Sequence, residues 1–302
     1  MKIMFTFPGQ GAQRPGMMHS LPQKNSVLKE ACDILQVAPA SLDSAEALKK
    51  TREVQLCLLI SGAAWSSELI RNRIIPDFVS GLSIGAFPAA VCSGALDFSD
   101  AVRLVALRGE LMENTCPSGY GLTALSGLTL KQVEMLVDNR ETWIANINAE
   151  RQIVIAGSNE GMGRVAEKAI ENGAQKAQRL AVSVPSHCAL LSEPAEKLAA
   201  AFSGIRLRRP RIAYLSGSTG RVLWDPKRIA EDLAFNMART VLWHDAMTAA
   251  YEREVRLAIE MPPGAALTML TRQVFPSGEA ISLEQGGTDL AWHLAKKTRL
   301  AA

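Results

Sequence analysis

A serine flanked by two glycines is the feature of this chain with the clearest chemical meaning. Residues 81–85 read Gly-Leu-Ser-Ile-Gly, after an apolar stretch (74–79) that we expect to form a strand and before small residues that favour a helix. Glycines on both sides of a serine let the backbone turn sharply and expose the hydroxyl at the tip. We therefore predict Ser83 as a nucleophile; the alternative is a serine that only caps a helix.

A serine hydroxyl attacks a carbonyl only when a base takes its proton, and histidine is the usual base. The chain has four histidines. His19 falls in an expected N-terminal loop, His244 on an expected helix and His293 near a polar tail. His187 follows a Pro-Ser pair in an expected loop where two domains meet, a position that often carries catalytic groups. We predict His187 as the base, against the alternative of a structural or solvated histidine.

Acyl transfer through a serine also needs hydrogen-bond donors for the oxyanion of the tetrahedral intermediate. The N–H of Ile84, directly after the serine, is one candidate. The turn at residues 8–11 (Pro-Gly-Gln-Gly), which follows the first apolar run, offers a second donor from Gln10 or Gly11. On its own sequence this turn could equally be an ordinary strand end.

An arginine interrupts the apolar face of a predicted helix downstream of the serine. This residue, Arg108, has Glu110 and Glu113 nearby in the sequence, and an ion pair with one of them is the ordinary interpretation. Its planar guanidinium would instead suit bidentate capture of a free carboxylate on a substrate.

Two kinds of segment must position these groups. Strand and helix patterns alternate in the first part of the chain, which predicts a parallel sheet covered by helices, with ligands beyond the carboxyl ends of the strands. Residues 121–187 instead follow the order β-α-β-β-α-β, with the last strand expected over 176–184, which is typical of a ferredoxin-like unit. We therefore predict an α/β fold: a large α/β-hydrolase-like catalytic domain with a parallel sheet (1–120 and 188–302), and a small inserted ferredoxin-like subdomain (121–187).

Composition excludes several other classes of protein. The 302 residues can bury a large core, and the net charge of +3 is too small for a dedicated nucleic-acid binder. Residues 206–211 (Arg-Leu-Arg-Arg-Pro-Arg) form a basic run. Such a run is usually a solvated face or a strand edge, and the alternative is a docking patch for an acidic protein. No apolar run approaches the roughly 20 residues of a membrane span, and the N-terminus lacks a signal-peptide pattern. We expect a cytoplasmic protein that binds neither nucleic acid nor membrane.

The cysteines do not suggest a disulfide framework or a metal site. An odd number of widely spaced cysteines is not typical of a disulfide framework, and the Cys-x-x-Cys pairs typical of zinc sites are missing from the sequence. We expect no metal. The five positions are Cys32, Cys57, Cys92, Cys116 and Cys188.

Taken together, these motifs resemble the malonyl-CoA:acyl carrier protein transacylase family over nearly the whole chain. The resemblance rests on residues 8–13 (Pro-Gly-Gln-Gly-Ala-Gln), Gln55, 81–85, 107–112 (Leu-Arg-Gly-Glu-Leu-Met), 146–148 (Asn-Ile-Asn) before 153–157, 184–187 (Val-Pro-Ser-His) and 262–264 (Pro-Pro-Gly).

The resemblance implies a serine–histidine dyad in which malonyl-CoA acylates Ser83 and His187 is the general acid and base. It implies that Arg108 holds the malonyl carboxylate, and that a main-chain carbonyl near Asn236 orients the imidazole. A coenzyme A thioester would be a substrate, an acyl carrier protein the partner, and no cofactor would stay bound. Supporting roles fall on Gln55, Gly11, Asn148 and Asn236.

Two departures bear on the pathway. Members active in fatty acid synthesis usually have His where this chain has Leu82 and Leu-Gly-Glu where it has residues 84–86 (Ile-Gly-Ala); they also usually read Gly-Pro-Gly at 262–264. Residues 81–87 look like the epsilon subunit of bacterial malonate decarboxylase, which loads a dedicated carrier subunit, and this is the preferred interpretation. The alternative is a transacylase of fatty acid or polyketide synthesis. A serine esterase or thioesterase and a non-enzymatic interaction module are less favoured.

Overall fold

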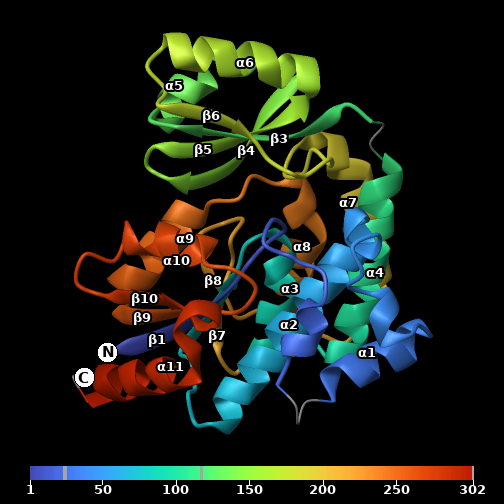
Figure 1. Ribbon diagram of the computed structural model, residues 1–302, viewed down its shortest axis with the longest axis vertical. Coiled ribbons are helices and arrows are strands. Elements are labelled where there is room, and N and C mark those ends of the chain that lie inside the picture. The colour runs from blue at the N-terminus through green and yellow to red at the C-terminus, as the bar shows by residue number, and fades with distance from the viewer. Residues whose placement is uncertain (23–25, 116–117, 301–302) are drawn as a thin grey trace.

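The computed structural model describes residues 1–22, 26–115 and 118–300, so the expectation for Cys116 lies outside the described residues. Figure 1 shows a large lower part and a smaller upper part, each built around its own sheet. The large sheet has the order β10-β9-β1-β2-β7-β8. Its strands are β1 (Lys2–Phe7), β2 (Phe78–Gly81), β7 (Ala213–Leu215), β8 (Val222–Leu223), β9 (Val255–Glu260) and β10 (Glu279–Ser282).

The large sheet is parallel except for β8, which pairs antiparallel with β7. Side chains of a strand point alternately to opposite faces, so a strand covered on both sides must be apolar throughout. In β1, Phe5 and Phe7 belong to one buried core, whereas Met4 belongs to a second core on the other face. This double burial explains why the first run of the chain reads as continuously apolar.

Helices cover both faces of the large sheet, as the prediction required. In the first core, helices pack against the face of the sheet that carries Phe5. In the second core, α9 and α10 pack against the face that carries Met4. The helices are α1 (Val27–Leu35), α2 (Thr51–Arg71), α3 (Ala86–Ser93), α4 (Phe98–Thr115), α7 (Ser192–Ala201), α8 (Pro226–Phe235), α9 (Trp243–Glu252), α10 (Ala266–Arg272) and α11 (Leu283–Leu300).

The small sheet is antiparallel, with the order β4-β5-β3-β6 that a ferredoxin-like unit has. Its two helices lie together on the outer face, away from the large part (Figure 1). The elements are β3 (Tyr120–Ser126), α5 (Leu130–Glu134), β4 (Thr142–Ala149), β5 (Gln152–Ser158), α6 (Asn159–Glu171) and β6 (Lys176–Arg179). The predicted fold class is therefore confirmed.

Some predicted bounds were wrong. The strand expected over 176–184 ends at Arg179, and the chain then leaves the sheet. Beyond it, Leu180 and Val182 line a cavity, and these apolar side chains gave the segment the appearance of a strand. The strand before the serine begins at Phe78 rather than at 74, after a proline that has no N–H for a ladder.

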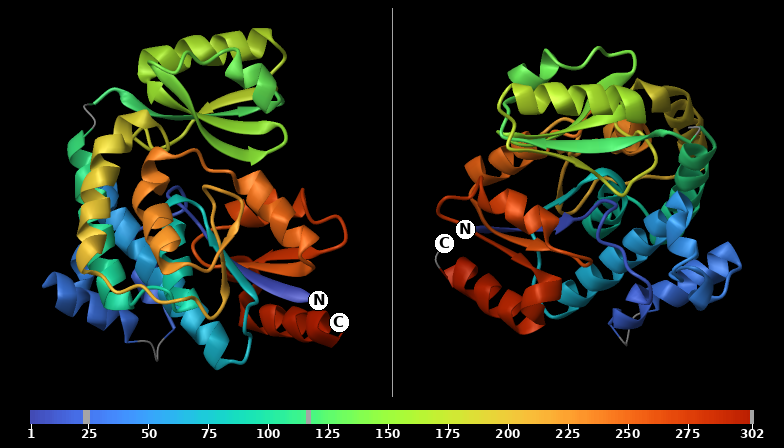
Figure 2. Two further views of the ribbon diagram at one scale, coloured as in Figure 1. Left: turned by 180° about the vertical axis from the view of Figure 1, so that it is seen from behind. Right: turned by 45° about the horizontal axis from the view of Figure 1, so that its top comes forward.

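Backbone hydrogen bonds join the two parts at one seam. Val241, between α8 and α9, donates its N–H to Ala145 O and accepts from Ile147 N, both at 2.8 Å. The Thr240 hydroxyl donates to Ile144 O at 3.0 Å. Strand β4 of the small sheet is thus bonded to a segment of the large part. Figure 2 shows the two parts from two further directions.

The arginine run at 206–211 lies at the amino end of β7. Arg208 donates its N–H to Ala95 O and forms an ion pair with Asp97, and Arg211 donates its N–H to Ser93 O. A parallel sheet of this kind binds ligands at the carboxyl ends of its strands. The run is therefore placed against α3 and its following turn, at the opposite end of β7.

The described residues contain neither a membrane-spanning helix nor a cluster of metal ligands. Within 1–22, 26–115 and 118–300, no helix is long and apolar enough to cross a membrane. In the same ranges, no group of three His, Cys, Asp or Glu side chains could hold a metal ion. Of the cysteines that the structure describes, Cys32, Cys57 and Cys92 are free thiols.

Candidate active site

Ser83 sits at a sharp turn between β2 and α3. Its φ of 57° lies in the left-handed region, which non-glycine residues adopt under local constraint. A Cβ on Gly81 would lie 1.9 Å from the carbonyl carbon of Gly85, and a Cβ on Gly85 would lie 2.1 Å from Phe7 O. Both glycines are therefore required by contact. The alternative of a helix cap was wrong, because the N-cap of α3 is Gly85.

His187 is buried and held by backbone atoms of the segment after α8. Its N–H donates to Met237 O at 2.6 Å, and its φ is 66°. The ring Nδ1 faces Asn236 O at 2.7 Å and Arg239 O at 3.2 Å. A carbonyl oxygen can only accept, so Nδ1 must carry the proton. The other ring nitrogen, Nε2, is then the one that can take a proton from a nucleophile.

The protonation state of His187 follows from its surroundings. Burial, together with the positive charge of Arg108, lowers the pKa of His187 to about 4. The two facing carbonyls act in the opposite direction but do not outweigh burial. The imidazole is therefore neutral at neutral pH, which is the form that a general base needs.

Ser83 and His187 line one cavity of about 720 Å³, although they are far apart in the sequence. Its floor comes from the ends of β1 and β2, and its roof from the small sheet through β3, β4 and β5. The segment that follows β6 brings Leu180, Val182 and His187 to one side. The expectation that His187 lies where the two parts meet is thus met by the cavity.

Arg108 lies behind Ser83 and is fully covered. Its Nη2 donates to Ser83 Oγ at 3.3 Å and to Asn236 Oδ1 at 3.0 Å, and its Nη1 donates to Gln55 Oε1 at 2.7 Å. Burial lowers the pKa of Arg108 to about 9. Its Nε is buried without a hydrogen-bond partner. The guanidinium therefore keeps donor capacity next to the serine.

The expected alternative, an ion pair of Arg108 with Glu110 or Glu113, was wrong. Both acids instead accept hydrogen bonds from Arg52 of α2. The Arg52 Nε donates to Glu110 Oε1 at 2.8 Å, and the Arg52 backbone N–H donates to Glu113 Oε1 at 3.1 Å. No carboxylate of the described residues lies within ion-pair distance of Arg108. A buried cation without a protein counter-ion is costly, and it suits an anionic ligand.

Gln55 and Asn236 connect the members of the site. Gln55 accepts from Arg108 and donates its Nε2 to Gln10 Oε1 at 3.3 Å. The side-chain oxygen of Asn236 accepts from Arg108, and its main-chain oxygen accepts from His187. Its Nδ2 donates to Ser83 O at 3.4 Å. The family resemblance implied supporting roles for both residues, and the structure brings them together.

The two turns that could bind an oxyanion lie side by side. The N–H of Leu82 donates to Phe7 O at 3.0 Å, which sets the serine turn against the end of β1. The Gly11 N–H donates to Gln13 Oε1 at 2.7 Å, so it is already used. Of the two candidates in the first turn, Gln10 is the one left to act with Ile84.

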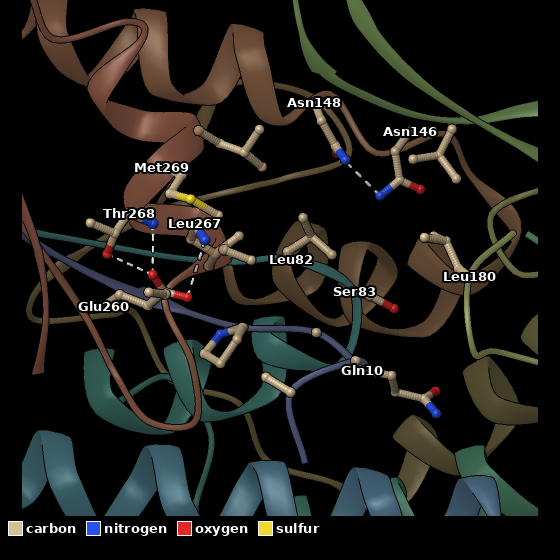
Figure 3. A pocket seen from close by; sticks show the side chains of 18 of the residues that line it. Gln10, Leu82, Ser83, Asn146, Asn148, Leu180, Glu260, Leu267, Thr268 and Met269 are labelled. Carbon is tan, nitrogen blue, oxygen red and sulfur yellow. Dashed lines mark hydrogen bonds between the residues drawn. The ribbon is translucent and has the colours of Figure 1, made fainter. Parts of the chain in front are cut away.

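Figure 3 shows the cavity with Gln10 and Ser83 on one side and Asn146 and Asn148 above them. The Asn146 Nδ2 donates to Asn148 Oδ1 at 3.3 Å, and Asn146 Oδ1 is buried without a partner. Asn148 is thus on the cavity but has no hydrogen bond to Ser83 or His187 among those described. The wall opposite is apolar; Leu82, Leu267 and Met269 contribute to it.

One buried acid on the cavity was missed by sequence reasoning. Glu260, the last residue of β9, accepts from the N–H groups of Leu267 and Thr268 and from the Thr268 hydroxyl. Burial raises its pKa, while these donors lower it. Figure 3 shows these bonds at the start of α10. A polar residue ending an apolar run was the one signal that could have marked it.

Comparison with known proteins agrees with this geometry. The acyl transferase domain family matches residues 4–288. The chain belongs to this family. Malonyl CoA-acyl carrier protein transacylases of Haemophilus influenzae and Bacillus subtilis are 33% and 34% identical to this acyl transferase, over 93% and 90% of its length and 95% and 90% of theirs.

Solved structures give the same result. The FabD protein of Acinetobacter baumannii superposes with a TM-score of 0.91 at 30% identity, covering 100% of this chain and 99% of that one. A malonyl-transacylase solved in complex with a type II polyketide synthase acyl-carrier protein has a TM-score of 0.90 at 30% identity, with coverage of 98% and 100%. The acyl transferase described here is therefore an enzyme of this family.

Proposed function

We propose that this acyl transferase moves a malonyl group from malonyl-CoA to the prosthetic-arm thiol of an acyl carrier protein, through a malonyl-Ser83 intermediate. One observation carries the proposal: the hydroxyl of Ser83 is hydrogen-bonded to a buried guanidinium, and no carboxylate in the part of the chain that the structure describes pairs with that guanidinium. A dicarboxylic acyl group supplies the thioester carbon to the serine and the free carboxylate to Arg108. The names and the carrier complex of the similar proteins support the same reaction.

In the first half-reaction, His187 Nε2 accepts the Ser83 proton as Oγ attacks the thioester carbon. The N–H groups of Ile84 and Gln10 stabilise the oxyanion, and the protonated His187 returns the proton to the departing coenzyme A sulfur. The carrier thiol then attacks the malonyl ester by the same steps in reverse order. Arg108 holds the malonyl carboxylate in both halves, and coenzyme A thioester is a substrate rather than a bound cofactor.

Hydrolysis by an esterase-type triad is less favoured. Such enzymes orient the histidine with a carboxylate. Here the Nδ1 of His187 faces the carbonyls of Asn236 and Arg239.

The identity of the carrier is the finer part of the proposal. The similar proteins reported above are malonyl CoA-acyl carrier protein transacylases or a malonyl-transacylase of polyketide synthesis, so they favour a carrier of fatty acid or polyketide synthesis. The malonate decarboxylase carrier remains the second candidate, because of the sequence of residues 81–87. Leu82 of that segment packs at the turn, and a Cβ on Gly9 would lie 2.8 Å from its Cδ2.

Radiolabelled malonyl-CoA tests the proposal. The parent enzyme should retain label on the peptide that contains Ser83, and Ser83→Ala should retain none. Adding a holo carrier should move the label to the carrier's thioester. Comparing the acyl carrier protein of fatty acid synthesis with the malonate decarboxylase carrier separates the two pathways by kcat/KM. Absence of label on Ser83 in the parent would refute the mechanism.

A further inference from the structure

A buried carboxylate lies outside the cavity, on the helix that leads to Asn236. Asp232 of α8 is 3% exposed. Its Oδ2 accepts from the Tyr214 hydroxyl at 2.8 Å, and its Oδ1 accepts from Ser216 Oγ at 2.6 Å. Tyr214 lies in β7 and Ser216 follows its last residue. The carboxylate therefore joins α8 to the carboxyl end of β7, which lies between β2 and the edge strand β8.

This network extends in both directions. Ser216 Oγ also accepts the N–H groups of Ser218 and Thr219, at 3.2 and 3.1 Å, which fixes the loop after β7. At the other side, the N–H of Asn236 donates to Asp232 O, so the two residues share one helical turn. Asp232 is thus one turn away from the residue that contacts Ser83, Arg108 and His187.

The energetics point to positioning rather than to stability. Burial raises the pKa of Asp232, and the hydroxyl donors only partly oppose it. A buried carboxylate is weak evidence for a gain in stability, because desolvation offsets the hydrogen bonds. What two directed hydrogen bonds add is a defined position for the helix end.

We propose that Asp232 is a positioning residue for acyl transfer. By anchoring the last turn of α8 to the end of β7, it holds Asn236 where its carbonyl meets His187 Nδ1 and its side-chain oxygen meets Arg108 Nη2. The inference rests on the roles proposed above for His187 and Arg108. Displacements of about 1 Å at a catalytic group can cost on the order of 100-fold in rate, so an anchor of this kind is consequential.

The test compares two variants that weaken the anchor between α8 and β7. Asp232→Ala removes the anchor, and Tyr214→Phe removes one of its hydrogen bonds without changing the packing of the ring. Asp225→Ala is the matched control, because Asp225 caps the other end of the same helix by accepting from Lys227 N and Arg228 N. Each variant is assayed for Tm, for kcat/KM with malonyl-CoA and for the preference of malonyl-CoA over acetyl-CoA.

We expect Asp232→Ala to lose about tenfold or more in kcat/KM and to lose part of its malonyl preference. Tyr214→Phe should change both quantities in the same direction by less. Asp225→Ala should lower Tm and keep kcat/KM within about twofold of the parent.

The inference is overturned if Tyr214→Phe and Asp232→Ala keep both kcat/KM and preference within about twofold, whether or not Tm falls. If Asp232→Ala does not fold, Tyr214→Phe decides. Labelling of Ser83 in the parent is measured separately, so failure of the proposed function is distinguished from failure of this inference.

Discussion

Arg108→Ala tests the carboxylate-binding role most directly. The guanidinium of the parent donates to Gln55, Asn236 and Ser83, and its removal leaves the oxygens of Gln55 and Asn236 without this donor. That structural loss affects every acyl donor alike. The loss of an ion pair with the substrate affects only malonyl-CoA, so the ratio of kcat/KM for malonyl-CoA and acetyl-CoA isolates it.

The size of the effect follows from the hydrogen bonds available. Two charge-assisted bonds to a carboxylate, at about 1.5 kcal/mol each, give about 3 kcal/mol, which corresponds to a factor on the order of 100. We therefore expect the malonyl-to-acetyl ratio to fall by on the order of 100-fold in Arg108→Ala. Transfer of each radiolabelled acyl group to a holo carrier protein measures the ratio.

A matched control lies on the same helix. Arg103 of α4 is exposed and pairs with Asp100 at 3.4 Å, so Arg103→Ala should leave the ratio unchanged. A ratio in Arg108→Ala within about twofold of the parent would show that the guanidinium does not bind the malonyl carboxylate.

Three further predictions concern the base, the serine turn and the clamp. Because burial and Arg108 lower the pKa of His187 to about 4, the imidazole loses its function as a base only as pH falls through that value. In a stopped-flow pH profile kcat/KM should therefore stay level from neutral pH down to about pH 5 and then fall, and a midpoint near about 6.5 would contradict this. Gly85→Ala places a Cβ 2.1 Å from a backbone oxygen of β1 and should lower Tm sharply. Gly163→Ala on α6 is the control, because its Cβ would have no atom within 4 Å; it should raise the free energy of unfolding in denaturant by about 0.5–1 kcal/mol. Gln55→Glu gives Arg108 a carboxylate partner, so kcat/KM for malonyl-CoA should fall about tenfold and that for acetyl-CoA less; equal losses would argue against competition for the guanidinium.

The serine turn could be predicted because its signal is local. A strand, two glycines and a helix follow one another within a few residues, and the contacts of Gly81 and Gly85 show why other residues do not fit. The order of elements in residues 121–187 similarly predicted the small sheet. The bounds were less accurate, as at Arg179, because residues facing a cavity are as apolar as residues in a strand.

The partners of Arg108 could not be derived from spacing. Gln55 and Asn236 lie 53 and 128 positions away from Arg108 in the sequence. The residues near Arg108 include two acids, Glu110 and Glu113, and spacing alone favours these as its partners. The family resemblance supplied Gln55 and Asn236, and the structure shows how they meet. Asp232 carried no signal at all, since its partners on β7 are set by the packing of a helix on a sheet.

The seam at Val241 bears on how far the small sheet and the large part can separate. Its two backbone hydrogen bonds join the segment between α8 and α9 to β4, the strand that contributes Asn146 and Asn148 to the cavity. Moving β4 away from the large part would break both bonds, at a cost of about 1 kcal/mol each. We therefore expect this wall of the cavity to keep its place while one reactant leaves and the next one enters.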